Sequence, residues 1–143
     1  MASYKKILVL LDLSDASEQI AVAARDMAAH SNAALVVLHV VEFVPTEPMG
    51  ETLMPTMQIE EELAQRASIK IKELSARLDL TRATARVETG NKKTEILRVA
   101  KEEAVDLIIL GSRVRHGLGI LVNFTEDTVL HAAHCDVLAI RLT

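Results

Sequence analysis

The amino-acid sequence indicates an α/β fold, with a single doubly wound, five-stranded parallel sheet in the strand order 3-2-1-4-5 and helices on both faces. Short apolar runs alternate with stretches of helical periodicity along the whole chain, as in repeated strand–helix–strand units joined by right-handed crossovers. Half of the residues are hydrophobic but only 2% are aromatic. The core is therefore expected to consist of Val, Leu, Ile and Ala, the usual filling of a parallel sheet between helices.

The first strand and the first helix are expected within residues 5–32. Residues 5–11 form a continuous apolar run after the lysine pair, which is typical of a strand buried on both faces. Ser14 is a suitable N-cap for a helix over residues 15–30. Small and aliphatic side chains recur at helical spacing along one side of that helix, which permits close approach to a sheet.

The second strand, at residues 34–41, is followed by the least regular part of the chain. Residues 42–57 contain all three prolines and Gly50. This loop is too long for a routine connection, so it either has a function or is mobile. A long amphipathic helix follows at residues 57–78. Its apolar side chains, at steps of three and four, are Ile59, Leu63, Ala67, Ile71, Leu74 and Leu78.

The remaining elements continue the alternation. Residues 83–88 alternate weakly between polar and apolar, which is typical of an edge strand. A third helix is expected at 91–104 and a fourth strand at 106–110, an almost wholly apolar run. The last helix is expected at 124–133 and the fifth strand at 136–142.

Composition limits the class of protein. The 143 residues are expected to form one domain over 1–143 with a single sizeable core. A net charge of −4 argues against nucleic acid as a partner, and no apolar run is long enough to span a membrane. The amino-terminal apolar run stops at Asp12 without the cleavage site of a signal peptide. Cys135 is the single cysteine, which fits a reducing compartment. We therefore expect a soluble cytoplasmic protein.

Residues 106–128 are the main candidate for a binding site. A buried strand is followed there by Gly111-Ser112, by Arg113 and Arg115, and by a helix that starts near Asn123. A strand, a glycine-bearing loop and a helix N-terminus, in that order, are how α/β proteins build phosphate sites.

The predicted topology places one further residue beside that stretch. In the strand order 3-2-1-4-5 the order reverses between the first and fourth strands, and ligands bind beyond the carboxyl ends of the strands at such a point. This geometry brings Asp12, after the first strand, close to Gly111-Ser112 and to the helix start.

Several segments resemble a known family. They are KKILVLLDLSDAS at the start, LVVLHVVE, DLIILGS followed by RHGL, and TVLHAAHCDVLAIRL near the end. Together they resemble the universal stress protein family, notably its classical bacterial subgroup, over nearly the whole chain. The resemblance implies the doubly wound fold and a homodimer.

The resemblance also implies a test for ATP binding. Family members that bind ATP carry a glycine, two residues, a second glycine, about nine residues, and then Gly-Ser or Gly-Thr. Here Gly111 supplies the first glycine, the second falls on Val114, and Gly-Ser falls on Asn123-Phe124 after a spacer that is shorter by one. Backbone amides must approach phosphates closely and a hydroxyl must reach them, so these changes favour a vestigial site.

Some residues of the loop offer compensation. Arg113 and Arg115 could pair with phosphates, Thr125 could replace the missing hydroxyl, and Gly117 and Gly119 could reshape the loop. The candidate nucleotide contacts are therefore Asp12, Gly111, Ser112, Arg113, Arg115, Asn123 and Thr125.

Each candidate contact also has a plain structural interpretation. Asp12 could contact a nucleotide, as its family counterpart lies beside the adenine and ribose, or it could satisfy the amides of a turn with Ser14. We favour the turn. Arg113 and Arg115 either clamp phosphate or are simply solvated, and the sequence leaves this open. No cofactor is expected, with ATP as the alternative.

Metal binding and catalysis have little support in the sequence. His131, His134 and Cys135 lie close together, but no fourth ligand accompanies them, so no metal site is expected. No Gly-x-Ser-x-Gly elbow follows any strand. A hydrolase or transferase would need acid and base groups in the crevice, and only Asp12 and His116 can be nominated.

The last strand, residues 136–142, predicts how the protein assembles. It would lie at the sheet edge and lacks the proline or lysine that would protect it. Pairing with the same strand of a second subunit about a two-fold axis would cover it. The first hypothesis is a non-enzymatic, homodimeric stress-response factor with protein partners that the sequence does not identify. The alternative is an ATP-binding sensor or slow ATPase.

Overall fold

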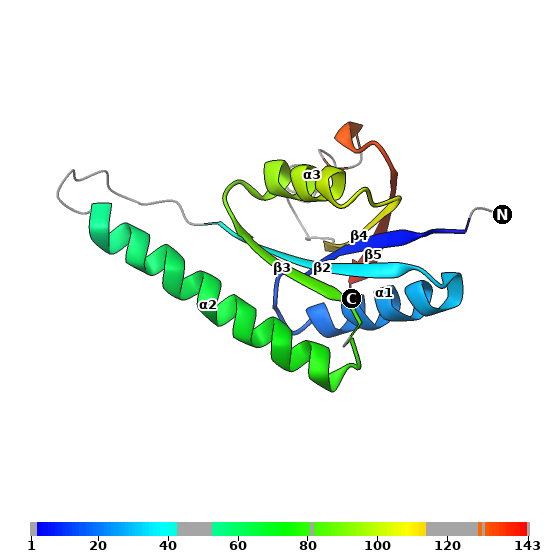
Figure 1. Ribbon diagram of the computed structural model, residues 1–143, viewed down its shortest axis with the longest axis horizontal. Coiled ribbons are helices and arrows are strands. Elements are labelled where there is room, and N and C mark those ends of the chain that lie inside the picture. Colours follow the sequence, from blue (N-terminus) through cyan, green and yellow to red (C-terminus); the bar gives the residue numbers. More distant parts are fainter. Residues whose placement is uncertain (1–2, 43–52, 81, 114–128, 130, 143) are drawn as a thin grey trace.

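The computed structural model describes residues 3–42, 53–80, 82–113, 129 and 131–142 (Figure 1). Five parallel strands form one sheet in the order β3-β2-β1-β4-β5. The predicted α/β fold and strand order are therefore confirmed. The elements are β1 (Lys6–Leu10), α1 (Ser17–Ser31), β2 (Ala34–Val41), α2 (Leu53–Arg77), β3 (Thr84–Thr89), α3 (Lys92–Glu102), β4 (Leu107–Arg113) and β5 (Asp136–Leu142).

Helices cover both faces of the sheet, with α1 and α2 on one face and α3 on the other (Figure 1). Alternate side chains of β1 therefore enter different cores. Ile7 and Val9 pack in the core under α1 and α2, whereas Leu8 packs in the core under α3. All three are fully buried, and each such side chain contributes roughly 1.5–3 kcal/mol to folding. Burial on both faces explains why this strand is continuously apolar in sequence.

The start of α1 differs from the prediction. Ser14 is not its N-cap, because the N-cap is Ala16, which makes no side-chain cap hydrogen bond. The physical reason lies in the preceding turn. Leu13 adopts a φ of 62°, in the left-handed region, and Ser14 turns back to donate its amide and hydroxyl to Asp12 Oδ1. The helix proper then begins at Ser17.

The long helix α2 starts earlier than the predicted 57–78 and extends past the carboxyl edge of the sheet (Figure 1). Its apolar stripe is confirmed where the sheet lies beneath it, since Ile71 and Leu74 are buried. The prediction was wrong for Ile59, which is 43% exposed. Periodicity identifies the correct side of the helix, but the sheet ends before the helix does. Of the predicted irregular loop, residues 43–52 lie outside the described residues.

The strand β4 is longer than the predicted 106–110. Gly111, Ser112 and Arg113 continue the strand and pair with Ile140, Arg141 and Leu142 of β5. The strand β5 has the predicted bounds and lies at one edge of the sheet, and β3 lies at the other. Of the predicted helix 124–133, residues 129 and 131–132 are helical and most of the rest lies outside the described residues.

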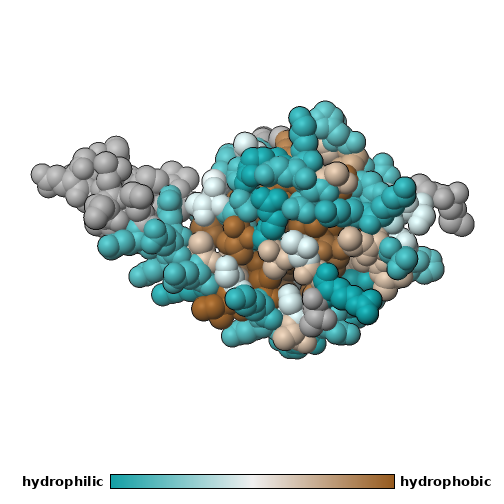
Figure 2. All heavy atoms as spheres, in the orientation of Figure 1, coloured by the Kyte–Doolittle hydropathy of each residue, from teal (hydrophilic) through white to brown (hydrophobic). Residues whose placement is uncertain are grey.

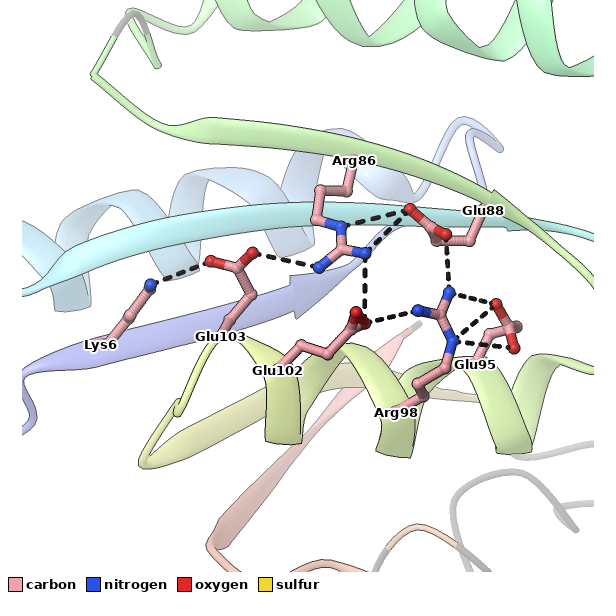
Figure 3. A network of polar contacts seen from close by, with 7 residues as sticks. All are labelled: Lys6, Arg86, Glu88, Glu95, Arg98, Glu102 and Glu103. Carbon is pink, nitrogen blue, oxygen red and sulfur yellow. Dashed lines mark hydrogen bonds and ion pairs between the residues drawn. The ribbon is translucent and has the colours of Figure 1, made fainter.

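A cluster of charged side chains joins α3 to β3 (Figure 3). Arg86 of β3 contacts Glu88, Glu102 and Glu103, and Arg98 of α3 contacts Glu88 from the helix side. These contacts cover the outer strand of the sheet with paired charges. We call this set the ionic cluster; its members are Lys6, Arg86, Glu88, Glu95, Arg98, Glu102 and Glu103.

Candidate functional site

A crevice lies beyond the carboxyl ends of β1 and β2. Its volume is about 440 Å³, which is within the range of small-molecule sites. The outer part of α2 forms one wall and the start of α3 contributes to the other side. We call it the carboxyl-edge crevice; the described residues that line it are Asp12, Leu13, His39, Val40, Val41, Glu42, Leu63, Arg66, Ala67, Lys70 and Lys92.

The topology explains the position of this crevice. The pairing of β1 with β4 ends at Val9 and Ile109, whereas β1 stays paired with β2 as far as Leu10 and Leu38. The chain after β1 leads to a helix on one face, and the strand order reverses at this point. The crevice therefore lies next to the switch point of the sheet, where ligands of doubly wound folds bind.

Asp12 organises the turn between β1 and α1. Its Oδ1 accepts hydrogen bonds from the Ser14 amide at 2.9 Å, the Ser14 hydroxyl at 2.6 Å and the Ser17 hydroxyl at 2.8 Å. The turn interpretation of Asp12 is thus confirmed. The residue also lines the crevice, and its contact with a nucleotide stays a prediction.

Gly111 has a packing role that the sequence did not reveal. A Cβ atom on Gly111 would lie 2.9 Å from Leu142 Cδ1 and 3.3 Å from Ile20 Cδ1. The glycine therefore lets α1 and β5 pack closely on β4. Its φ is negative, so no left-handed turn requires it. Neither Gly111 nor Ser112 is among the described residues that line the crevice.

The remaining predicted contacts cannot be assembled with Asp12 into one described site. The backbone of Arg113 belongs to β4, opposite Leu142. Arg115, His116, Asn123 and Thr125 lie outside the described residues. The phosphate half of the predicted site therefore stays a prediction. The same holds for the pairing of Asp12 with His116 as acid and base.

Two lining residues near the end of β2 were missed by the sequence analysis. His39 Nδ1 lies 2.7 Å from the carbonyl oxygen of Leu11, which ties β2 to the end of β1. Glu42 accepts a hydrogen bond from the backbone amide of Lys92 at 3.0 Å. These contacts hold the floor of the crevice and join it to the start of α3. A histidine inside the apolar run ALVVLHVV was the available signal.

Two cations of α2 were missed as well. Arg66 and Lys70 are exposed, four residues apart, and both line the crevice. In a sequence, such residues on an amphipathic helix indicate a solvated face. Their position beside the crevice depends on how far α2 extends beyond the sheet. Sequence periodicity does not contain that information.

The carboxyl-terminal His and Cys residues give no metal cluster in the described part of the chain, where no group of three or more His, Cys, Asp or Glu side chains could hold an ion. Cys135 is partly exposed beside the core under α3. Burial raises the pKa of its thiol, and Asp136 and Asp106 add to that effect. The thiol is thus held in its protonated, less nucleophilic form. None of the described helices has the length and apolarity needed to cross a membrane.

The chain is similar to known proteins over nearly its whole length. A sequence model described as the universal stress protein family matches residues 3–141. Universal stress protein A homolog 2 of Coxiella burnetii is 36% identical, over 99% of this chain and 98% of that protein. The solved structure of universal stress protein UspA from Lactobacillus plantarum has a TM-score of 0.84 and 25% identity, and covers 99% of this chain and 100% of its own.

A universal stress protein solved in complex with cAMP shares the fold at a TM-score of 0.71, with 21% identity over 98% of both chains. The matches extend over the strands and helices that surround the crevice. The chain belongs to the universal stress protein family.

Proposed function

We propose that this protein is a cytoplasmic, homodimeric stress-response factor of the classical bacterial subgroup, which acts through protein contacts without a catalytic cycle or tight ATP binding. The packing of Gly111 is the single observation that carries the proposed lack of tight ATP binding. Gly111 is the retained first glycine of the ATP-binding pattern, and contacts with Ile20 and Leu142 account for its lack of a side chain. Its presence therefore does not argue for a phosphate.

The rest of the pattern supports the same proposal. Val114 places a β-branched side chain where the family pattern has its second glycine, and Phe124 replaces a hydroxyl-bearing residue. Both changes oppose close approach of phosphate groups to backbone amides.

Assembly is proposed through β5. This strand lies at the edge of the sheet, and its sequence DVLAIRL contains neither proline nor lysine. An unprotected edge strand tends to pair with another strand. Pairing of two β5 strands about a two-fold axis would cover both edges with one self-complementary contact.

Calorimetric titration with ATP and Mg²⁺ tests the nucleotide part of this proposal. We expect no binding with a Kd below about 1 mM. A micromolar Kd would overturn the proposal.

Restoring the family pattern gives a second test of the same loop. The triple variant Val114→Gly, Asn123→Gly, Phe124→Ser should raise ATP affinity by at least about tenfold, because it returns backbone access and a hydroxyl. Val114→Ala is the matched control, since it removes the branched side chain without the freedom of glycine, and it should change affinity little. A correctly folded triple variant without any gain contradicts this account of the loop.

The alternative function is an adenine-nucleotide sensor or slow ATPase. The crevice of about 440 Å³ beside the switch point, with Asp12 in its lining, is the observation that favours it. Arg113, Arg115 and Thr125 would then contact the phosphates. Micromolar ATP binding in the titration above selects this alternative.

A further inference from the structure

We propose that a cavity between α3 and residues 132–135 binds a small carboxylic acid with an apolar body, and that Lys101 holds its carboxylate. We call it the α3 cavity. Its volume is about 490 Å³, within the range of small-molecule sites. The proposal goes beyond the function proposed above and does not rest on it.

The α3 cavity is separate from the carboxyl-edge crevice. It reaches Ala104 and Val105, which come just before β4, and Cys135, which comes just before β5. It therefore extends towards the amino ends of these strands, away from the switch point of the sheet. No described residue lines both the α3 cavity and the carboxyl-edge crevice.

Two sides of α3 carry different side chains. One side carries the helix's members of the ionic cluster, which contact side chains of β3 (Figure 3), and Figure 2 shows hydrophilic residues over α3. Thr94, Leu97 and Lys101 recur at steps of three and four and line the α3 cavity. Residues at this spacing lie on one side of a helix. The cavity therefore lies along a side of α3 that the ionic cluster does not occupy.

The inner wall of the α3 cavity is apolar. Ala100, Val105 and Ile108 are buried, and Leu97 and Ala133 are partly buried. All five residues line the cavity. Apolar surface of this kind is covered favourably by an alkyl or aryl group, which makes few demands on hydrogen bonding.

The charged groups of the lining are cations. The described lining residues include Arg98 and Lys101 but no Asp or Glu, although the whole chain has a net charge of −4. Arg98 is already paired with three carboxylates of the ionic cluster. Lys101 is exposed, and its ammonium makes no ion pair with any described residue. One unpaired ammonium beside an apolar wall matches a ligand with one negative charge.

The other wall supplies a second hydrogen-bond donor. His134 is exposed and lines the α3 cavity, and a neutral imidazole has one N–H donor in either tautomer. A carboxylate has two acceptor oxygens, so it can accept from an ammonium and from an imidazole at once. Lys101, His134 and the apolar wall together fit an alkyl or aryl monocarboxylate.

Isothermal titration with octanoate at about pH 7.5, where the carboxylate is ionised, tests the proposal. We expect one octanoate per chain with a Kd of about 1 mM or below. Propionate has the same charge but a shorter body, and it should bind at least about tenfold more weakly. Octan-1-ol has the same body without the charge, and it should bind at least about threefold more weakly.

Two variants test the two parts of the site. Lys101→Gln should weaken octanoate binding by about threefold or more and leave the octan-1-ol affinity unchanged. Lys72→Gln is the matched control, because Lys72 is an exposed cation of α2 that does not line the cavity. Ala132→Trp fills the cavity from an exposed lining position and should abolish binding, whereas Ala132→Ser should retain it. Thermal melts will verify that the variants are folded.

The unmodified protein offers an independent test at Cys135. It is the single cysteine of the chain, is partly exposed and lines the α3 cavity. Alkylation by iodoacetamide, followed by mass spectrometry, therefore reports on one site. Octanoate at about ten times its Kd should slow alkylation by about fivefold or more, and propionate at the same concentration should not.

Several results would overturn the proposal. They are no octanoate binding at about 10 mM, equal affinities for octanoate and either comparison probe, and octanoate affinities that are the same in the Lys101 and Lys72 variants. An alkylation rate of Cys135 that octanoate does not change would also overturn it. None of these results bears on the ATP proposal, because the variants do not alter residues 111–125.

Discussion

The two edge strands of the sheet, β3 and β5, differ in what their side chains meet. In β3, Arg86 and Glu88 belong to the ionic cluster under α3, and their side chains are only 20% and 24% exposed (Figure 3). In β5, Ala139 is exposed, and Leu138 and Ile140 are only partly buried against the core under α1 and α2. Charges at an edge oppose the addition of another strand. The difference supports the proposal that β5, rather than β3, pairs with a second subunit.

The largest expected effect comes from a charge in the middle of β5. Ala139→Glu should raise the Kd of the dimer by about a hundredfold, because two-fold pairing would bring two carboxylates together at the interface. Sedimentation equilibrium over a range of concentrations measures this change. Ala85→Glu places the same charge on an exposed alanine of β3 and should leave the dimer intact. Equal weakening by both substitutions would break the distinction between the two edges.

Removing the charge at the centre of the ionic cluster should destabilise the β3 side. Arg86→Met keeps the apolar stem but deletes contacts with Glu88, Glu102 and Glu103. We expect a loss of about 1–2 kcal/mol in the free energy of unfolding, measured with urea. Arg82→Met, at an exposed position just before β3, should change stability by less than about 0.5 kcal/mol. A similar loss of unfolding free energy in both variants would mean that the contacts of the ionic cluster do not stabilise the fold.

A side chain at position 111 should weaken the packing of β5 and α1 against β4. Gly111→Ala places a Cβ 2.9 Å from Leu142 Cδ1 and 3.3 Å from Ile20 Cδ1. The expected loss is about 1 kcal/mol in the free energy of unfolding, because both neighbours are side-chain ends that can shift. Ser112→Ala is the adjacent control. If thermal and urea denaturation show no difference between Gly111→Ala and the unmodified protein, the packing role of this glycine is refuted.

The smallest effect concerns pH and the ionic cluster. Hydrogen bonds from Lys6 and then Arg86 hold the pKa of Glu103 below its ordinary value of 4.5, and Arg98 does the same for Glu95. Both carboxylates therefore contribute stability that is complete above pH 4.5 and is lost as the pH falls through their folded-state pKa values. The urea midpoint should fall between about pH 5 and pH 3.

Glu103→Gln is the reference for this titration. It removes one of the two carboxylates of the ionic cluster whose pKa is lowered, so the urea midpoint of the variant should decline less steeply over the same interval. High salt should reduce the difference between the two proteins, because the cluster is partly exposed and screened. If the urea midpoints of the two proteins fall in parallel with pH, Glu103 does not contribute to the loss of stability in acid.

The fold was predictable because local sequence and tertiary structure agree for most elements. The strands β2 and β5 have the predicted bounds, since each is a short apolar run between polar or turn residues. The strand β4 was predicted too short because Gly111-Ser112-Arg113 resembles a loop in sequence. Its extension depends on backbone pairing with residues 140–142 of β5, which no local pattern contains.

The candidate site was less predictable than the fold. Asp12 was identified because it follows the first strand directly, and its turn role agrees with the structure. The cations Arg66 and Lys70 were not identified, because periodicity assigns them to a solvated face. Periodicity also assigned Ile59 to the apolar stripe of α2, although this residue is 43% exposed. For all three residues, the point at which the sheet ends beneath α2 determines whether the side chain is buried or lies beyond the sheet.

The sedimentation mass of the unmodified protein tests the central claim most directly. At micromolar concentration we expect a species of two 15.7 kDa chains, because β5 is an edge strand that contains neither proline nor lysine. A mass near 15.7 kDa for a single chain under the same conditions would contradict the account.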